Sequence, residues 1–258
     1  MANYSTEPRL IAFDMDGTLI SDRFIFRLAH RFGFEAELGE IILRNIPEYE
    51  KTRSVASLLK EIKVREIIDT LNQIPLSPGT QLTALELKRE GHVLAIISDS
   101  YTIVTERLKK RLGFNCTVAN KLVVEGGKIT GEVEMPLNWT SNRTGCLKHS
   151  VCKLNALVRL SEKTKIPLER TVAVGDNIAD ICMLRQAGLG IAFNPKTKAV
   201  EQSADITINK HMLQLLTIIR EQRLSKASPT HTEQGNISPI CLFSSKEEIR
   251  HLHQPMED

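Results

Sequence analysis

The sequence lacks the features of a membrane-spanning or exported protein. Its 258 residues contain no apolar run of the roughly 18 residues that a membrane-spanning helix needs. It also has no basic head followed by an apolar stretch and a small-residue cleavage site, which is the pattern of a secretory signal. These absences predict a cytoplasmic protein without a membrane partner.

Cysteines are few, and their spacing does not indicate a disulfide framework. There are five, an odd number, and none forms a C-x-x-C pair, so a disulfide-stapled fold or a zinc ribbon is not expected. Cys146, His149 and Cys152 recur at every third residue and superficially resemble a soft-metal site. On a helix the outer two would point about 120° apart and could not easily share one ion. A helix start with two half-buried thiols is the preferred interpretation.

The chain also lacks a strong charge of either sign. Lys and Arg total 34 against 31 for Asp and Glu, a difference too small to favour a nucleic-acid partner. The slight basic excess is compatible with a small anionic substrate. The length allows one large domain, or one domain with a smaller insert, and a substantial core. It does not define an oligomeric state.

What the sequence does have is an alternation of short β-rich runs with helical stretches. The runs are apolar at successive positions, as in strands that are covered on both faces. They lie at 9–13, 92–98, 170–175, 188–193 and 205–208. The helical stretches lie at roughly 78–90, 101–112, 150–162, 178–186 and 196–202. This alternation predicts an α/β fold with a doubly wound, Rossmann-like parallel sheet.

Three segments depart from the alternation. Residues 23–75 have helical spacing and no convincing strand, which predicts a small helical cap inserted after the first strand. Residues 119–137 form a predicted β-hairpin with a Gly-Gly turn, which extends the edge of the sheet. Residues 223–258 are rich in Ser, Pro, Gln and His, and a disordered tail is expected there. The predicted core domain comprises residues 1–22 and 76–222.

Polar side chains stand at the ends of three predicted strands. Asp14 follows the first strand, Ser98 ends the second, and Asp176 follows the third. Ligands of doubly wound sheets bind outside the carboxyl ends of the strands, so these groups are expected to converge. Asp180 places a further carboxylate near the start of the next helix. The three carboxylates are hard oxygen ligands of the kind that Mg²⁺ prefers, and a cation would relieve their mutual repulsion.

These residues resemble the motifs of the haloacid dehalogenase superfamily of phosphohydrolases. The first motif, D-x-D-G-T, stands at 14–18, and the second, a Ser or Thr after an apolar strand, is Ser98. The fourth, G-D-x-x-x-D, runs from 175 to 180. The third, a Lys ahead of the fourth, is assigned to Lys153, with Lys148 as the alternative.

The resemblance covers roughly residues 8–220 and is greatest to the phosphoserine phosphatase-like subfamily. It rests on the stretches "TVAVGDNIADICMLRQAGLGIAF" and "VANKLVVEGGKITGEV" as well as on the motifs. That subfamily has a helical cap after the first motif, which is what residues 23–75 resemble. The resemblance therefore implies a phosphomonoesterase, with phosphoserine as the default substrate.

The resemblance also implies a role for each motif residue. Asp14 would attack phosphorus and form an aspartyl-phosphate, and Asp16 would protonate the leaving oxygen and then activate water. Mg²⁺, Lys153, Ser98 and the backbone N–H groups around Gly17 would draw charge off the transferring phosphoryl group. The residues assigned to the metal are Asp14, Asp16, Asp176 and Asp180.

The chain departs from the subfamily around the substrate. Arg23 stands where a Glu that binds the substrate ammonium is usual, although Asp22 could serve if the cap is offset by a residue or two. Asp99 and Ser100 stand where two glycines are usual, and Ala179 where Asn is usual. We expect Arg23 and Asp99 to contact the substrate. Three alternatives stay open: another small phosphomonoester, a non-water acceptor, or a non-catalytic regulator with this fold.

Overall fold

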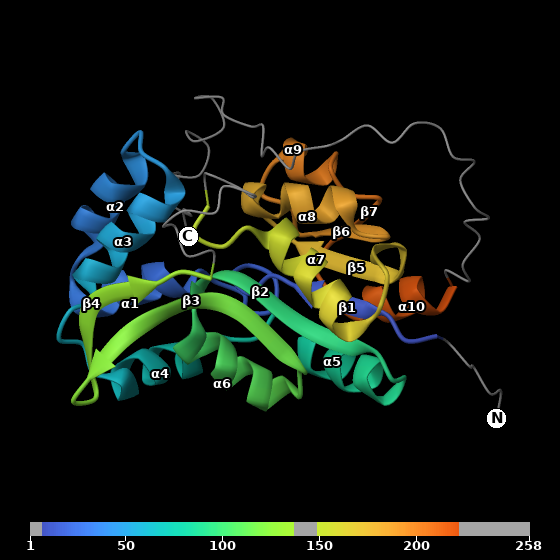
Figure 1. Ribbon diagram of the computed structural model, residues 1–258, viewed down its shortest axis with the longest axis horizontal. Coiled ribbons are helices and arrows are strands. Elements are labelled where there is room, and N and C mark those ends of the chain that lie inside the picture. Colours follow the sequence, from blue (N-terminus) through green and yellow to red (C-terminus); the bar gives the residue numbers. More distant parts are fainter. Residues whose placement is uncertain (1–6, 137–148, 222–258) are drawn as a thin grey trace.

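The computed structural model describes residues 7–136 and 149–221, which form one seven-stranded sheet with helices on both faces (Figure 1). The strand order is β4-β3-β2-β1-β5-β6-β7, and each neighbouring pair is parallel except β3 with β4. The strands are β1 (Leu10–Phe13), β2 (Val93–Tyr101), β3 (Cys116–Glu125), β4 (Lys128–Glu134), β5 (Thr171–Gly175), β6 (Leu189–Phe193) and β7 (Ile206–Ile208). The predicted doubly wound α/β fold is confirmed.

Two helical layers cover the sheet, as Figure 1 shows. One face carries α5 (Thr80–Arg89), α6 (Thr102–Leu112) and α10 (Gln214–Glu221). The other carries α7 (Lys153–Thr164) and α8 (Ile181–Gln186). The short elements are η1 (Leu168–Arg170), η2 (Ile178–Asp180) and α9 (Lys198–Glu201).

Alternate residues of the central strand β1 belong to two separate hydrophobic cores. Leu10 and Ala12 pack in the core beneath α7 and α8. Ile11 and Phe13 pack in the core on the α5 and α6 face, and all four are buried. Because both faces of β1 are covered, the strand is apolar at every position rather than at every second one.

Four helices fill residues 24–73, between β1 and α5. They are α1 (Phe24–Phe32), α2 (Glu35–Leu43), α3 (Glu48–Leu58) and α4 (Val64–Gln73). Two segments, at Ser21 and at Pro75, connect this unit to the rest of the chain, and together they are called the neck. They bond to each other, because the N–H of Ser21 donates to the carbonyl of Pro75 at 3.0 Å. None of these helices, nor any other in the described part of the chain, is long and apolar enough to cross a membrane.

The predicted hairpin is β3–β4, and it has a second role that the sequence did not indicate. Its turn is at Gly126 and Gly127, and β4 forms the edge of the sheet as expected. The far end of the hairpin also bonds to the segment between α3 and α4. The N–H of Glu61 donates to the carbonyl of Ile129 at 2.8 Å, and that of Val64 to Gly127 at 3.0 Å. The helical unit is thus held at its neck and at the hairpin.

Strand β2 continues past Ser98 to Tyr101, so the prediction that Ser98 ends the strand is wrong. The pairing with β3 runs regularly to Ile97, opposite Val118, and resumes at Tyr101, opposite Asn120. Three residues of β2 therefore face one of β3, which is a β-bulge. The residues of this bulge are polar, so a prediction from hydropathy ends the strand too early.

Two helix boundaries also differ from expectation. The helix predicted from 150 begins at Lys153, and the one predicted at 178–186 is divided into η2 and α8. The division follows from Asp180, whose side chain accepts backbone N–H groups at the turn instead of pointing to solvent. The predicted tail at 223–258, together with Cys146 and Lys148, lies outside the described residues.

Candidate active site

Three buried carboxylates meet at the carboxyl edge of the sheet. Asp14 follows β1, Asp176 follows β5, and Asp180 lies in η2. One oxygen from each lies within 4.8 Å of the others. Strands β1 and β5 are adjacent, and the N–H of Asp14 extends their ladder by donating to Val174 at 2.9 Å. The parallel ladder therefore brings together residues that are far apart in the sequence.

Lys153, the first residue of α7, is buried among these carboxylates. Its Nζ lies 2.6 Å from Oδ1 of Asp14 and 2.6 Å from Oδ1 of Asp180. The other oxygen of Asp180 accepts the N–H groups of Asp176, at 3.1 Å, and Asn177, at 3.0 Å. Both oxygens of Asp180 thus have protein partners, and its carboxylate anchors the lysine to the turn after β5.

The cluster has the negative charge and the oxygen ligands to hold a divalent cation. The ammonium of Lys153 contacts Asp14 and Asp180 but is the only buried cation beside three carboxylates in the described residues of the cluster. Lys196 reaches Oδ2 of Asp176 only at 4.0 Å, from a half-exposed position. Oδ1 of Asp176 is buried without a hydrogen-bond partner, so it is available as a ligand. Buried carboxylate oxygens suit a hard cation, and Asp14 and Asp176 are the residues that could bind it.

Burial and crowding perturb the pKa values of these groups. Burial raises the pKa of Asp14 well above its usual value, the ammonium of Lys153 opposes this rise, and the neighbouring carboxylates add to it. Burial and Asp180 raise the pKa of Asp176 to about 7. Burial alone would lower the pKa of Lys153, but Asp14 and Asp180 outweigh burial and raise it. Lys153 is therefore a permanent cation, and a bound metal ion would favour the ionised carboxylates.

Asp16 lies outside the carboxylate cluster and bonds to the start of α1, the first helix after β1. Its Oδ1 accepts the N–H of Phe24, the first residue of α1, at 2.5 Å. Desolvation raises the pKa of Asp16 to about 7, and this hydrogen bond partly opposes the rise. Asp14 and Asp16 are thus held in different environments, although they are only two residues apart. The carboxylate of Asp16 is not among the three that lie together.

The β2 bulge places Ser98 in the interior and Asp99 at the surface. Ser98 is fully buried, and its Oγ accepts the N–H of Ser100 at 3.1 Å. The carbonyl of Asp99 accepts a hydrogen bond from Nδ2 of Asn120 at 2.6 Å. The same Nδ2 donates to Oγ of Ser150, at 3.0 Å, in the segment before α7. Asn120 and Ser150 were not among the predicted site residues, although a buried Asn in the run "TVANKLVV" is the signal that could have indicated one of them.

Arg23 lies at the junction between the neck and α1, directly before Phe24. Its guanidinium stacks over the ring of Phe26 at 5.5 Å, and its charge opposes the rise in the pKa values of Asp16 and Asp176. Asp22 already pairs with Arg27 at 3.5 Å. The charge that this junction presents to the site is therefore positive.

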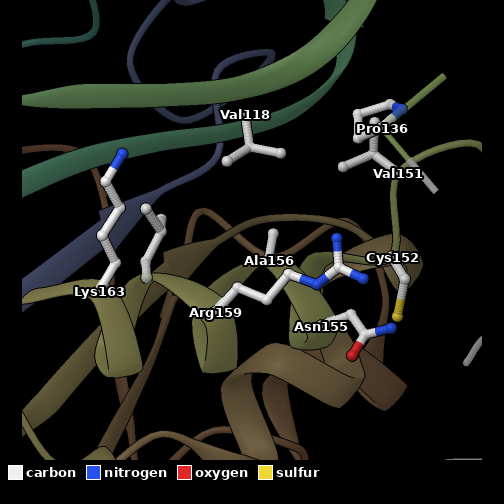
Figure 2. Close-up of a pocket in the computed structure, with 9 residues that line it drawn as sticks. Val118, Pro136, Val151, Cys152, Asn155, Ala156, Arg159 and Lys163 are labelled. Atoms are coloured by element: carbon white, nitrogen blue, oxygen red, sulfur yellow. The ribbon is translucent and has the colours of Figure 1, made fainter. Parts of the chain in front are cut away.

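A separate pocket lies between α7 and β3 (Figure 2). Figure 2 shows Val118 on the strand side, above the helix that carries Ala156 and Arg159. The lining residues include no Asp or Glu and none of the clustered carboxylates. This pocket is thus distinct from the acidic site.

Comparison with known proteins agrees with this geometry. Residues 11–185 match the haloacid dehalogenase-like hydrolases. Phosphoserine phosphatase from Methanocaldococcus jannaschii is 34% identical over 209 residues, which cover 80% of this chain and 94% of that protein. Phosphoserine phosphatase from Streptomyces coelicolor is 32% identical over 222 residues, which cover 83% of this chain and 52% of that protein.

A solved phospho-aspartyl intermediate analogue of phosphoserine phosphatase is also similar in structure. It superposes with a TM-score of 0.70 at 31% identity, covering 83% of this chain and 99% of that one. The fold and the family match agree with the order of the four motifs along the chain. This chain belongs to the haloacid dehalogenase-like hydrolase family, with phosphoserine phosphatases among its relatives.

Proposed function

We propose that the protein is a Mg²⁺-dependent phosphomonoesterase that forms an aspartyl-phosphate on Asp14, with O-phosphoserine as its substrate. The observation that carries the proposal is the buried contact of Asp14 with Lys153 beside two further carboxylates. Identity of 34% to a protein named phosphoserine phosphatase supports the substrate. O-phosphoserine is a small phosphorylated substrate, and a solved substrate-bound complex of a phosphoserine phosphatase is similar to this chain with a TM-score of 0.71 at 30% identity.

Asp14 is the nucleophile in this proposal. Its carboxylate attacks phosphorus, the bond from phosphorus to the ester oxygen breaks, and water then releases phosphate from the aspartyl group. Lys153, 2.6 Å from Asp14, favours the ionised form of the carboxylate against the effect of burial and offers a fixed positive charge to the phosphoryl oxygens. The hydroxyl of Ser98 accepts the N–H of Ser100, which leaves its proton available to a phosphoryl oxygen.

Asp16 is the general acid and base. A carboxyl group with a pKa of about 7 can donate a proton to the leaving oxygen in one step and accept one from water in the next. The hydrogen bond from Phe24 fixes its orientation toward the cap.

Mg²⁺ is the cation proposed for the acidic cluster, with Asp14 and Asp176 as the side chains that would hold it. When bound, it supplies positive charge that offsets the negative charge of the phosphoryl group. Asp180 acts through Lys153, because its two oxygens bond to that lysine and to backbone N–H groups.

A panel of phosphate esters, assayed with Mg²⁺ and with a chelator, tests the proposal. We expect phosphoserine to be hydrolysed better than p-nitrophenyl phosphate, and the chelator to remove activity. Asp14→Asn should abolish phosphate release, whereas Asp69→Asn, on an exposed face of α4, should leave it unchanged. Unaltered activity in folded Asp14→Asn would refute catalysis at this site. Equal turnover of the two esters would refute phosphoserine as the substrate.

Arg23 favours a second candidate, the same chemistry on an ester with an additional anionic group. Its positive charge acts on Asp16 and Asp176, where it would attract a carboxylate and repel an ammonium. Phosphoglycolate carries only the carboxylate and phosphoethanolamine only the ammonium. Preference for phosphoglycolate in the wild type, reversed in Arg23→Glu, would support the second candidate. The same preference in both proteins would contradict it.

A further inference from the structure

The bulge of β2 is held by a side chain from the neighbouring strand rather than by the ladder. Regular pairing of β2 with β3 stops at Ile97 and resumes at Tyr101, so the carbonyl of Asp99 has no place in the ladder. Nδ2 of Asn120, which is fully buried on β3, donates to this carbonyl at 2.6 Å. Asn120 thus supplies the hydrogen bond that the irregular strand cannot make.

This hydrogen bond also orients the hydroxyl of Ser98. The Asp99 carbonyl and the Ser100 N–H belong to one planar trans peptide, so fixing the direction of one fixes that of the other. The Ser100 N–H donates to Oγ of Ser98 at 3.1 Å. A short chain of bonds therefore runs from Asn120, through one peptide plane, to the serine hydroxyl.

The second hydrogen of the same amide reaches the segment that leads to Lys153. Nδ2 of Asn120 donates to Oγ of Ser150 at 3.0 Å, and Ser150 is itself buried. Lys153 begins α7 three residues later and contacts Asp14. A primary amide has two N–H donors in a fixed geometry, and here each goes to a different part of the site.

The two hydrogen bonds that Asn120 donates are accompanied by a buried acceptor. Its Oδ1 has no hydrogen-bond partner, and an unpaired buried acceptor is destabilising. An apolar residue at this position would avoid that cost but would lose both donated hydrogen bonds.

We propose that Asn120 is a positioning residue, which sets the distance and direction between Ser98 and Lys153 without touching the substrate. This inference rests on the proposed phosphoryl transfer at Asp14. The two phosphate-facing groups come from different elements, β2 and α7, and Asn120 bonds to both segments. Asn120 thereby fixes the position of β2 relative to the start of α7 at the phosphate site.

Steady-state kinetics with p-nitrophenyl phosphate and Mg²⁺ test the proposal on the full-length protein. Asn120→Ala removes both donors, and Asn120→Asp removes them at nearly constant volume. We expect kcat to fall about 10- to 100-fold in both variants with little change in KM, because misplacement affects the transition state more than binding. Ser150→Ala should lower kcat less, and the double variant Asn120→Ala/Ser150→Ala should be no slower than Asn120→Ala alone.

Thr105→Val is the matched control, since Thr105 is a fully buried polar residue of α6 that lies outside the site. It should shift the melting temperature and leave kcat unchanged. If the folded Asn120 variants keep the wild-type kcat, or lose no more of it than Thr105→Val, the positioning role is wrong while the proposed function stands. If the wild type releases no phosphate from any ester, the proposed function fails and this inference with it.

Discussion

Gly17→Ala tests whether the acidic cluster depends on close approach of the backbone after β1. Gly17 has φ +77°, and a Cβ there would lie 2.2 Å from Oδ2 of Asp176. Ordinary contact begins at 3.4 Å, so the carboxylate of Asp176 would have to retreat by about 1.2 Å. Displacement of a catalytic group by about 1 Å can cost roughly 100-fold in rate. We therefore expect kcat/KM to fall about 100-fold, and the Mg²⁺ concentration needed for half-maximal activity to rise.

Gly33→Ala is the matched control for backbone strain. Gly33 has φ +75°, and a Cβ there would meet nothing within 4 Å. Both substitutions force a left-handed conformation on an L-residue, at a cost of about 1 kcal/mol, but only one meets Asp176. In guanidinium, both variants should lose a similar free energy of unfolding from backbone strain, and Gly17→Ala should lose more because of the clash with Asp176. Only Gly17→Ala should lose activity. Wild-type activity in Gly17→Ala would show that the position of Asp176 is not required.

Three further substitutions have expected outcomes. Lys153→Met leaves the buried carboxylates of Asp14 and Asp180 without their cation, so we expect unfolding in guanidinium with a chelator to show a loss of about 3–5 kcal/mol. Burial lowers the pKa of His92 below 6.5, and the neutral ring accepts the N–H of Arg9 at Nδ1. The contribution of His92 to stability is therefore complete above pH 6.5 and is lost as the pH falls through the lowered pKa. His92→Phe should therefore reduce the loss of stability between about pH 7 and pH 5, and an unchanged pH profile would contradict this. Gly39→Ala, inside α2 with open space at the Cβ position, should raise the free energy of unfolding by about 0.5–1 kcal/mol.

The fold was predictable because its signals are local. Strands that are covered on both faces are apolar throughout, and β1, β5 and β6 lie where such runs stand in the sequence. The Gly-Gly turn of the hairpin was equally local. The attachment of that hairpin to the segment at Glu61 was not, because backbone hydrogen bonds between distant segments carry no residue-type signature.

The site could be anticipated in part, for a related reason. Asp14 and Asp176 each follow an apolar run, so sequence and sheet topology together predict that they meet. The separate environment of Asp16 depends on where α1 begins, and the β2 bulge depends on a contact with Asn120. Pairwise contacts across the sheet decide these features, and hydropathy does not record such contacts.

The position of β1 at the centre of the sheet has a consequence for how the protein folds. Leu10 pairs with Val93 on one side and with Thr171 on the other, so β1 is completed only when segments from across the chain have reached it. Contacts of such long sequence separation are slow to form. Asp14 directly follows β1, so we expect the return of phosphate release during refolding to follow completion of the sheet rather than chain collapse.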